Sequence, residues 1–549
     1  MKVFSIFCFI MFSAIYMQGQ QTVGLFNNTS NSFDGYTLFA PIKSDTTYLI
    51  DNCGERIHEW ISNYNPGLSV YLMDDGSILR TGKIGGMGGG SGIVEIIDWN
   101  SNVTWSYSAQ ATHGKQHHDI ELLPNGNILL IVWDERSQGD VVQAGSSTSN
   151  TYINSEQIIE VQPDFVNGGG TVVWEWKAWD HLIQDADAGK DNYGTVSQTP
   201  ERIDVNYLAH NSTDWLHFNG VAYNAALDQI IISVRSFNEF WIIDHSTTTA
   251  ESASSSGGNS GKGGNLLYRW GNPESYQQGT VGDRTLFFQH HAQWIADTLS
   301  EAGKIILFNN QAGSVVGQNY SQVNTINLPL DSVGNYTYLG GAYGPTTYDW
   351  TYQAPNPTDF YSNIISGVQR LPNGNTLICE GVGGRFFEVD DIGTKVWEYV
   401  NPVNDVGIIA QNVTPTVNNV FRCTRYPVTH SAFVGKILTP QGYLESGSTF
   451  SCNLYTSTET IEDYYTSDFL QLYPNPVSSS FTLEFQNADE KALTLDIIDI
   501  NGRLVVQKKL PPQTQRCDVG VDFLPSGLYL VKVIGANQIW TKKLIVNQE

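Results

Sequence analysis

Positive charge is scarce in this 549-residue chain. Lys and Arg total 29 against 55 Asp and Glu, so the formal net charge is −26 and the isoelectric point is about 4.7. Nucleic acid and anionic membrane surfaces repel such a chain, so we expect no nucleic-acid partner. The sequence also lacks a G-x-x-x-x-G-K-[ST] loop, and no G-x-G-x-x-G follows a strand pattern. We therefore expect neither a nucleotide-borne donor nor any other cofactor.

Long apolar runs are absent except at the N-terminus, where Met1-Lys2-Val3 precedes an apolar stretch from Phe4 to about Met17. One positive charge, a short apolar segment and small or polar residues near Gly19 predict a secretory signal peptide at 1–20. The alternative is a retained anchor. Because no later stretch approaches about 18 apolar residues, we expect no stable membrane insertion of the mature chain.

Cysteine is scarce as well. Of six cysteines, Cys8 leaves with the signal peptide, and the other five have neither zinc-knuckle nor C-x-x-C spacing. We expect no bound metal. Export to an oxidising compartment permits one or two disulfides. Pairing of Cys423 with Cys452 or with Cys53 is considered, and the alternative is that all five thiols are free. The sequence does not decide between them.

What the chain does have is short β-branched and aromatic runs separated by Gly, Asn, Asp and Pro, with little helical periodicity. An apolar-Pro-Asn-Gly-Asn turn recurs, and its Asn-Gly pair supplies the positive φ angles of a tight hairpin. It occurs at 123–127 and 371–375, with a degenerate Met-Asp-Asp-Gly-Ser copy at 73–77. Trp-bearing strand patterns recur beside these turns, at 57–60, 103–107, 173–176, 267–270 and 396–399.

A hairpin and a Trp strand that recur together are typical of propeller blades. We therefore predict an all-β chain with a six-bladed β-propeller over 22–455. The segment near Tyr48-Leu49-Ile50 is expected to pair into the last blade and close the ring. The alternative is a pair of ordinary β-sandwiches.

The composition changes after Cys452. Residues 456–470 are polar and acidic, like a linker, and short strands such as 481–485 predict a small C-terminal β-sandwich at 471–549. Tyr-Pro-Asn-Pro at 473–476 and Pro-Ser-Gly-Leu-Tyr at 525–529 resemble the C-terminal sorting domain of bacterial type IX secretion cargo. This resemblance implies the type IX secretion machinery as a partner. It also implies a secreted or outer-membrane cell-surface protein that passes through the periplasm.

Histidine is the last scarce residue, with 11 in the chain, yet two adjacent pairs occur, His117-His118 and His290-His291. Neighbouring side chains on a strand point to opposite faces, so we expect one of each pair to face a common site. Imidazole can transfer protons, bind metal or attack an electrophile. The residues expected to converge near the propeller axis are His118, Asp119, His217, Asn219, Arg235 and His290.

Three motifs carry a family resemblance. Asp-Trp-x-His-x-Asn at 214–219, Ser-x-Arg at 233–235 and Gln-His-x-Ala-x-Trp at 289–294 resemble the bacterial arylsulfate sulfotransferases in order and spacing. The resemblance covers roughly 22–440. It implies a six-bladed propeller that moves a sulfuryl group from an aryl sulfate donor to a phenolic acceptor through a sulfohistidine, without a nucleotide donor.

The same resemblance implies roles for single residues. His290 matches the nucleophile, His217 and Arg235 match the groups that hold the sulfuryl oxygens, and His118 matches the acid and base at the phenolic oxygen. Asn219, Asp119 and His291 are expected to bind substrate. His291 stands where the family pattern has Asp or Thr, which leaves the register open; we prefer His290 because it directly follows Gln289.

Two other functions are compatible with the sequence. One is a non-catalytic, surface-displayed propeller that binds glycan or protein. The other is a metal-dependent hydrolase with His118, Asp119, His217 and His290 as ligands, against which a cation at Arg235 argues. Arg422 and Arg425 lie near the expected closure of the ring, and structural pairing is the favoured interpretation for both.

Overall fold

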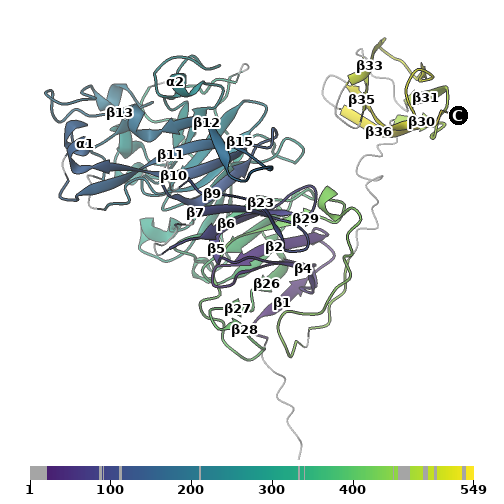
Figure 1. Ribbon diagram of the computed structural model, residues 1–549, viewed down its shortest axis with the longest axis horizontal. Helices are drawn as coiled ribbons and strands as arrows, with labels where there is room; N and C mark the ends of the chain where they lie inside the picture. Colours follow the sequence, from purple (N-terminus) through teal and green to yellow (C-terminus); the bar gives the residue numbers. More distant parts are fainter. Residues whose placement is uncertain are drawn as a thin grey trace, which may run out of the picture. The chain divides into compact units, whose positions relative to one another are not determined.

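The chain divides into two compact units, one reaching Tyr455 and one starting at Thr456. The computed structural model describes residues 21–85, 90, 92–109, 114–146, 148–208, 212–331, 334–338, 340–448, 450–455, 470–485, 493–499, 504–534 and 539–548. The predicted signal peptide at 1–20 and nearly all of the predicted linker at 456–470 lie outside the described residues. Both units are built from antiparallel β-sheet (Figure 1).

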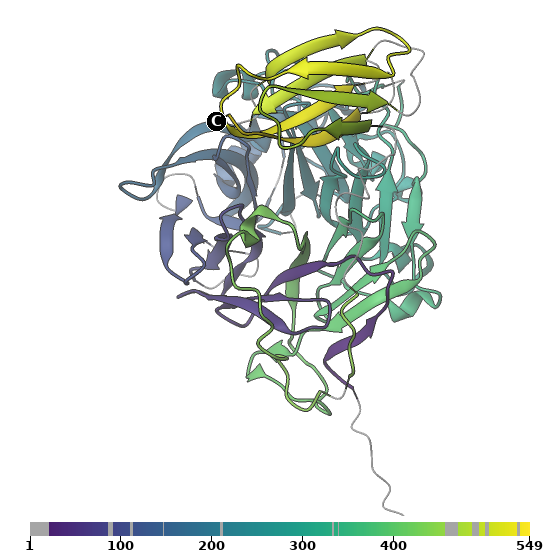
Figure 2. The same cartoon turned by 90° about the vertical axis from the view of Figure 1, so that its right-hand side faces the viewer.

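The larger unit is the predicted β-propeller, and its sheets follow one another around a common centre (Figure 2). The first sheet of eight strands consists of two antiparallel halves joined by one parallel pair, Leu68 with His118. One half holds β5 (Pro66–Leu72), β6 (Ile78–Lys83), β7 (Gly92–Ile97) and β8 (Val103–Tyr107). The other holds β9 (Gln116–Leu122), β10 (Ile128–Ser137), β11 (Tyr152–Pro163) and β12 (Gly170–Lys177).

Three further sheets continue the ring in chain order. One contains β15 (Phe218–Asn224), β16 (Gln229–Val234), β17 (Glu239–Asp244) and β18 (Tyr268–Trp270). The next contains β19 (His290–Trp294), β20 (Ile305–Asn309), β21 (Gln322–Ile326) and β22 (Trp350–Tyr352). The third contains β23 (Gly367–Arg370), β24 (Thr376–Glu380), β25 (Arg385–Val389) and β26 (Lys395–Val400).

The N-terminal strands close the ring. β1 (Gly24–Asn28) adds a fifth strand beside β26, and β2 (Gly35–Pro41) pairs with β29 (Val420–Pro427). β3 (Thr46–Ile50), which contains Tyr48-Leu49-Ile50, and β4 (Arg56–Ile61) complete that sheet. The predicted closure is therefore present. Apart from two short strand pairs, the described strands of this unit form six antiparallel groups of four, with β1 as a fifth strand beside β26.

Short helices and strand pairs decorate the ring. They are α1 (Gln138–Gln143), α2 (Thr249–Ser252), the parallel pair β13 (Leu182–Ile183) with β14 (Ile203–Asp204), and the pair β27 (Val403–Asn404) with β28 (Gly407–Ile408). Short 3₁₀ turns occupy other loops, such as Pro273–Tyr276. None of the helices in the described ranges is long and apolar enough to cross a membrane.

The two repeated sequence features have separate structural roles. The hairpin turns join the first two strands of three units, and Gly76, Gly126 and Gly374 adopt φ angles of 88°, 85° and 88° there. The Trp strands lie at the opposite edge of each unit. A buried indole N–H needs a hydrogen-bond acceptor, and four of these Trp side chains find one in the following unit. The acceptors are carbonyl oxygens at 2.6–2.8 Å, in the pairs Trp105–Gly169, Trp176–Gly264, Trp270–Pro345 and Trp397–Asn52.

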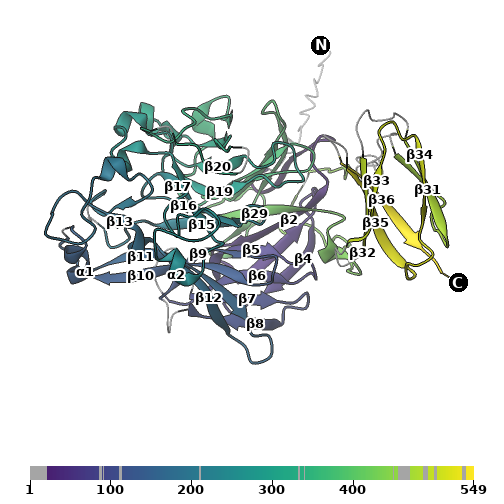
Figure 3. The same cartoon turned by 90° about the horizontal axis from the view of Figure 1, so that it is seen from above.

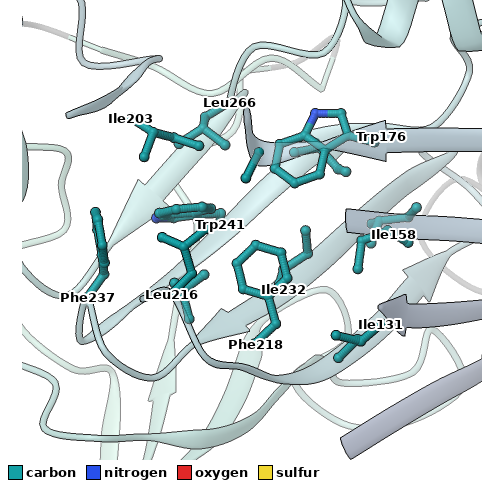
Figure 4. Close-up of a cluster of buried hydrophobic side chains, with 14 of the residues drawn as sticks. Ile131, Ile158, Trp176, Ile203, Leu216, Phe218, Ile232, Phe237, Trp241 and Leu266 are labelled. Atoms are coloured by element: carbon teal, nitrogen blue, oxygen red, sulfur yellow. The ribbon is translucent and has the colours of Figure 1, made fainter. Parts of the chain in front are cut away.

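An apolar core between the β9–β12 and β15–β18 sheets fixes the strand that carries part of the site. Phe218 at the start of β15 packs edge-on against Trp241, with ring centroids 5.8 Å apart, and lies parallel to Trp176 at 6.4 Å (Figure 4). All three side chains are fully buried. His217, the residue before Phe218, is therefore attached to one of the best-packed points of the propeller.

The disulfide in this unit differs from the expected pairings. Cys53, in the turn after β3, is bonded to Cys452, while Cys423 is a buried free thiol. Neither of the two pairings of Cys423 considered above is formed, nor are all five thiols free. Cys423 lies inside β29 and packs in a core cluster that also contains Cys379, whereas Cys53 and Cys452 meet where the chain leaves the propeller. The spacing of the cysteines in the sequence does not indicate that Cys53 and Cys452 are bonded.

The C-terminal unit is the predicted β-sandwich. One layer contains β30 (Leu470–Tyr473), β31 (Ser480–Phe485) and β34 (Arg516–Gly520). The other contains β33 (Leu504–Leu510), β32 (Leu493–Asp499), β35 (Gly527–Ile534) and β36 (Ile539–Val546). The two layers face each other around one apolar core that includes Phe481, Leu495 and Val531 (Figure 3).

The observed disulfide leads to a first prediction. Replacing both Cys53 and Cys452 by Ser should lower the free energy of unfolding of the propeller by roughly 2–5 kcal/mol, because the unfolded chain is no longer cross-linked. Calorimetry of the oxidised protein measures this. Cys517→Ser, which removes a free thiol in the sandwich, serves as the control and should leave the propeller transition in place. An unchanged propeller transition in the double variant would contradict the assignment.

Candidate active site

The inner ends of β9, β15, β16 and β19 bring the predicted residues together. His118 and Asp119 lie on β9, Asn219 lies on β15, and His290 and His291 begin β19. His217 immediately precedes β15, and Arg235 immediately follows β16; the Arg235 backbone N–H donates to the His217 carbonyl oxygen at 3.2 Å.

The backbone at this centre departs from regular strand geometry. His118, His217, Phe288 and His291 have φ angles of 52°, 55°, 55° and 56°, a region that non-glycine residues seldom occupy. The pairing of β19 with β20 also shifts register after His290. Strand alternation therefore fails here, and His117 and His118, expected on opposite faces, have their Nδ1 atoms 2.8 Å apart. Such strain persists only where the surrounding structure enforces it, and it clusters at functional sites.

His118 lies at the middle of the group. Its ring is 4.7 Å from that of His217, centroid to centroid. Burial lowers the pKa of His118 well below its usual value, and electrostatic interactions with His217, His117, His290 and Arg235 lower it further. His118 is therefore neutral. The predicted residues therefore lie close enough together to influence one another electrostatically.

His217 is oriented by Asp214. The Nδ1–H of His217 donates to Asp214 Oδ2 at 2.5 Å. Burial raises the pKa of Asp214, but the hydrogen bond from His217 and the electrostatic interactions with His217, His117 and Arg235 outweigh it, so the pKa falls below its usual value. Asp214 is thus a carboxylate that fixes the His217 ring and leaves Nε2 directed away from it.

Arg235 has no carboxylate in contact. Its guanidinium lies over the ring of Phe288, 4.7 Å from the centroid, and makes no hydrogen bond or ion pair within the described part of the chain. Burial lowers the pKa of Arg235, and the charge of Asp214 opposes this. A guanidinium remains charged under such conditions. Its N–H donors are therefore available to an anion.

His290 is held in one tautomer. Its Nδ1–H donates to Asn310 Oδ1 at 2.8 Å and to the Phe288 carbonyl oxygen at 3.2 Å. The Asn310 amide nitrogen donates to the carbonyl oxygens of Ser362 and Ile365, both at 2.9 Å, so its oxygen must face the imidazole. The lone pair of His290 is consequently at Nε2, which accepts a long 3.2 Å hydrogen bond from the Ile365 N–H.

Electrostatics keep His290 neutral. Burial lowers its pKa well below the usual value, and Arg235, His217 and Arg422 lower it further, against the hydrogen bond to Asn310. His291 has the opposite tautomer, because its Nδ1 accepts the Val368 N–H at 3.0 Å. Burial and Arg422 also lower the pKa of His291. Of the two neighbours, only His290 has an Nε2 lone pair.

Asp119 and Asn219 are occupied by protein partners. Asp119 Oδ1 accepts from the Tyr71 hydroxyl at 2.8 Å, and Oδ2 pairs with Arg422 at 2.7 Å. Arg422 also donates to the Asn219 carbonyl oxygen at 3.2 Å, and the Asn219 amide donates to the Gln289 carbonyl oxygen at 2.8 Å. In this geometry Asp119 holds Arg422 in place, and Asn219 ties β15 to the residue before His290.

Several residues at the centre escaped the sequence analysis. Asp214 belongs to the Asp-Trp-x-His motif, and its position three residues before His217 was the available signal. Asn310 and Phe288 gave none, because their partners are set by tertiary packing. Arg422 pairs with Asp119 as the favoured interpretation expected, but it also influences both His290 and His291. Arg425 is purely structural, bonded to the buried Glu388 at 2.5 Å.

Comparison with known proteins identifies the family of this chain. The family model described as "Arylsulfotransferase (ASST)" matches residues 25–414, which is most of the chain. The chain belongs to the arylsulfotransferase family. A second model, a secretion system C-terminal sorting domain, matches residues 471–547. The sorting domain indicates export through the type IX system to the cell surface or beyond. No curated protein matches the chain significantly.

Solved structures resemble this chain only distantly. A protein of unknown function from Bacteroides caccae has 12% identity and a TM-score of 0.39, covering 72% of this chain and 99% of its own. A catalytically inactive variant of virginiamycin B lyase from Staphylococcus aureus, with quinupristin, has 10% identity and a TM-score of 0.32, covering 70% and 90%. These scores are too low to support any argument about function.

The structure argues against the metal-dependent hydrolase considered as an alternative. Within the described ranges, no group of three or more His, Cys, Asp or Glu side chains is placed to hold a metal ion. Asp119, one of the four residues considered as ligands, has both carboxylate oxygens engaged by Tyr71, Arg422 and the Val221 N–H. The arrangement instead combines neutral imidazoles with guanidinium groups, which suits an anion.

The pKa shifts generate a second prediction. As the pH falls from 8 to 5, His245 should take up its proton first. Burial lowers its pKa, but hydrogen bonds to Glu160 and Asp228 outweigh this and raise it. His118, His290 and His291 should stay neutral throughout, because burial and neighbouring cations lower their pKa values. ¹⁵N NMR of histidine-labelled protein measures each step. Ordinary titration of these three residues near pH 6.5 would contradict the site described above.

Proposed function

We propose that this protein transfers a sulfuryl group from an aryl sulfate to a phenol through a sulfohistidine at His290, without a nucleotide donor or metal. The observation that supports this most is the pairing of two features. His290 is a buried, neutral imidazole with its lone pair at Nε2, and Arg235 is a cation beside it without a carboxylate in contact. A neutral nucleophile and an unmatched cation together fit an anionic electrophile.

In the first half-reaction, His290 Nε2 attacks the sulfur of the aryl sulfate, and the sulfur–oxygen bond to the phenol breaks. The 3.2 Å hydrogen bond from Ile365 gives way to the new nitrogen–sulfur bond. By analogy with phosphoryl transfer, the transition state is loose and its charge lies on the three equatorial oxygens. Arg235 supplies N–H donors to these oxygens, the imidazolium form of His217 supplies its Nε2–H, and His118 gives a proton to the departing phenolic oxygen.

The second half-reaction reverses the first with another phenol. The acceptor hydroxyl gives its proton to His118 and its oxygen attacks the sulfur, releasing His290. Asn310 supports both halves, because its oxygen stabilises the positive charge that develops at the Nδ1–H of sulfated His290. Asp214 acts in the same way on His217.

A display propeller with no catalytic role is the competing function. It does not require the strained backbone at His118, His217 and His291, which costs of order 1–3 kcal/mol per residue. It also does not require a buried Arg235 that forms no ion pair within the described residues. Sulfuryl transfer uses both features.

The third prediction tests the proposed function kinetically. With 4-nitrophenyl sulfate and no acceptor, the protein should release a burst of nitrophenolate equal to the enzyme concentration, and added phenol should restore turnover. His290→Ala should abolish both. Arg235→Ala should slow the burst by about 10²–10³-fold, because it removes a donor to the transferring oxygens. His430→Ala, which alters a half-buried histidine remote from these motifs, is the control and should behave as wild type. Absence of burst and turnover in the wild type rejects the proposal.

The fourth prediction concerns export. A chain that ends at residue 455 lacks the whole C-terminal unit, so it should remain in the periplasm while its propeller stays folded. Cell fractionation and the sulfotransferase assay measure location and folding separately. The matched control is the full chain with Cys517→Ser, which alters the sandwich without removing it. Surface delivery of the truncated chain would contradict the role of residues 471–547.

A further inference from the structure

Behind His118 lies a row of buried side chains that the reaction described above leaves unused. The Nδ1 of His118 is 2.8 Å from the Nδ1 of His117, and the Nε2 of His117 is 2.7 Å from Glu156 Oε2. His117 and Glu156 are fully buried. The row therefore runs outward to the site as carboxyl, imidazole, imidazole.

The protein holds this row firmly. The His117 ring stacks on Trp133, with centroids 4.6 Å apart and planes 23° from parallel. Glu156, on β11, accepts the backbone N–H of Phe218 at Oε1, at 3.2 Å, which leaves Oε2 for His117. The positive φ of His118 turns its ring toward His117. The stacking on Trp133, the hydrogen bond from Phe218 and the backbone conformation of His118 together align the side chains of Glu156, His117 and His118.

Hydrogen-bond rules allow the row two complementary states. A protonated Glu156 donates to His117 Nε2, so the Nδ1–H of His117 donates to His118 Nδ1, and His118 carries its proton at Nε2. An ionised Glu156 accepts from His117 Nε2–H, so every proton shifts one step and His118 has a lone pair at Nε2. In both states each imidazole is neutral. The first state presents an acid to the site and the second presents a base.

We propose that Glu156 and His117 form a proton relay that switches His118 between general acid and general base during sulfuryl transfer. This inference rests on the proposed function. Glu156 and His117 act through His118 and do not touch substrate, so they are positioning residues.

Each half-reaction balances with this relay. In the first, the phenolic oxygen takes the Nε2 proton of His118, His118 Nδ1 takes the proton of His117 Nδ1, and His117 Nε2 takes the proton of Glu156. Aryl sulfate and neutral His290 become free phenol and a sulfohistidine without net charge, and Glu156 becomes the carboxylate. The acceptor phenol returns the proton along the same path in the second half-reaction.

The electrostatics of the row support the acid state at rest. Burial raises the pKa of Glu156 well above its usual value, and the charge of Asp214 adds to this against the Phe218 N–H and His217. Burial lowers the pKa of His117 to about 3, with Asp214 opposing and Lys115 assisting. Proton storage on Glu156 avoids a buried imidazolium next to Arg235, where positive charge is already in excess.

The fifth prediction uses Glu156→Gln, which keeps the acceptor for Phe218 and donates to His117 but has no transferable proton. With phenyl sulfate, a poor leaving group, the burst rate should fall by about 10²–10⁴-fold. With 4-nitrophenyl sulfate, whose phenolate leaves without a proton, the rate should stay within a few-fold of wild type. Glu160→Gln is the matched control: Glu160 lies on the same strand but is bonded to His245, so both donors should react normally.

A purely structural role for Glu156 predicts a different pattern. Glu156→Gln would then slow both donors equally while the wild type remains active, and this result overturns the relay. A wild type that is inactive with every aryl sulfate instead rejects the proposed function, and the melting temperature of each variant reports its folding.

A second measurement tests the relay without turnover. ¹⁵N chemical shifts at neutral pH should show His117 protonated at Nδ1 and His118 protonated at Nε2, in the wild type and in Glu156→Gln. Protonation of His118 at Nδ1 in the resting wild type overturns the proposal, because the row would then lack the acid state.

Discussion

A guanidinium without an ion pair governs the centre of this propeller. Arg422 is neutralised by Asp119, whereas Arg235 is stacked on Phe288, forms no ion pair within the described residues and feels the charge of Asp214 only at a distance. Burial is the main reason that the pKa values of His118 and His290 are low, and Arg235 lowers both further, with the larger effect at His290. The imidazoles are therefore neutral chiefly because they are buried, and the guanidinium adds to this effect. An anion that enters the site relieves the charge imbalance, and a sulfate ester provides that anion together with an electrophilic sulfur.

The packing of the surrounding strands holds this strained site in place. Backbone strain at His118, His217 and His291 would relax in a loosely packed loop, but each residue adjoins a strand of the ring. Phe218, the residue after His217, is packed between Trp176 and Trp241, and Trp side chains hydrogen-bond one unit to the next. The closure by β1 and β2 and the Cys53–Cys452 bond complete the ring. The well-packed outer strands thus hold the strained backbone of the central histidines in place.

Much of the fold could be predicted from the sequence because its repeats are local. The Pro-Asn-Gly-Asn turn and the Trp strand are each recognisable from a few consecutive residues, and together they indicate propeller blades. The disulfide could not be predicted, since Cys53 and Cys452 are separated by 399 residues and meet only when the ring closes. The site shows the same division. His217 and Asp214 are three residues apart and share a motif, whereas the partners of His290 and His117, Asn310 and Glu156, come from other strands or loops. Alternation along a regular strand also gave a wrong picture of His117 and His118, because the positive φ at His118 overrides it.

The central claim is that His290 Nε2 becomes covalently sulfated. The most direct test is to mix the protein with excess aryl sulfate in the absence of acceptor, quench within one turnover, digest at alkaline pH and locate the added sulfuryl mass by tandem mass spectrometry. The account predicts one sulfuryl group, on the peptide that contains Gln289-His290-His291, at His290, and its loss when phenol is added before the quench. A sulfuryl group on His291 or elsewhere, or none on an enzyme that turns over, would contradict it.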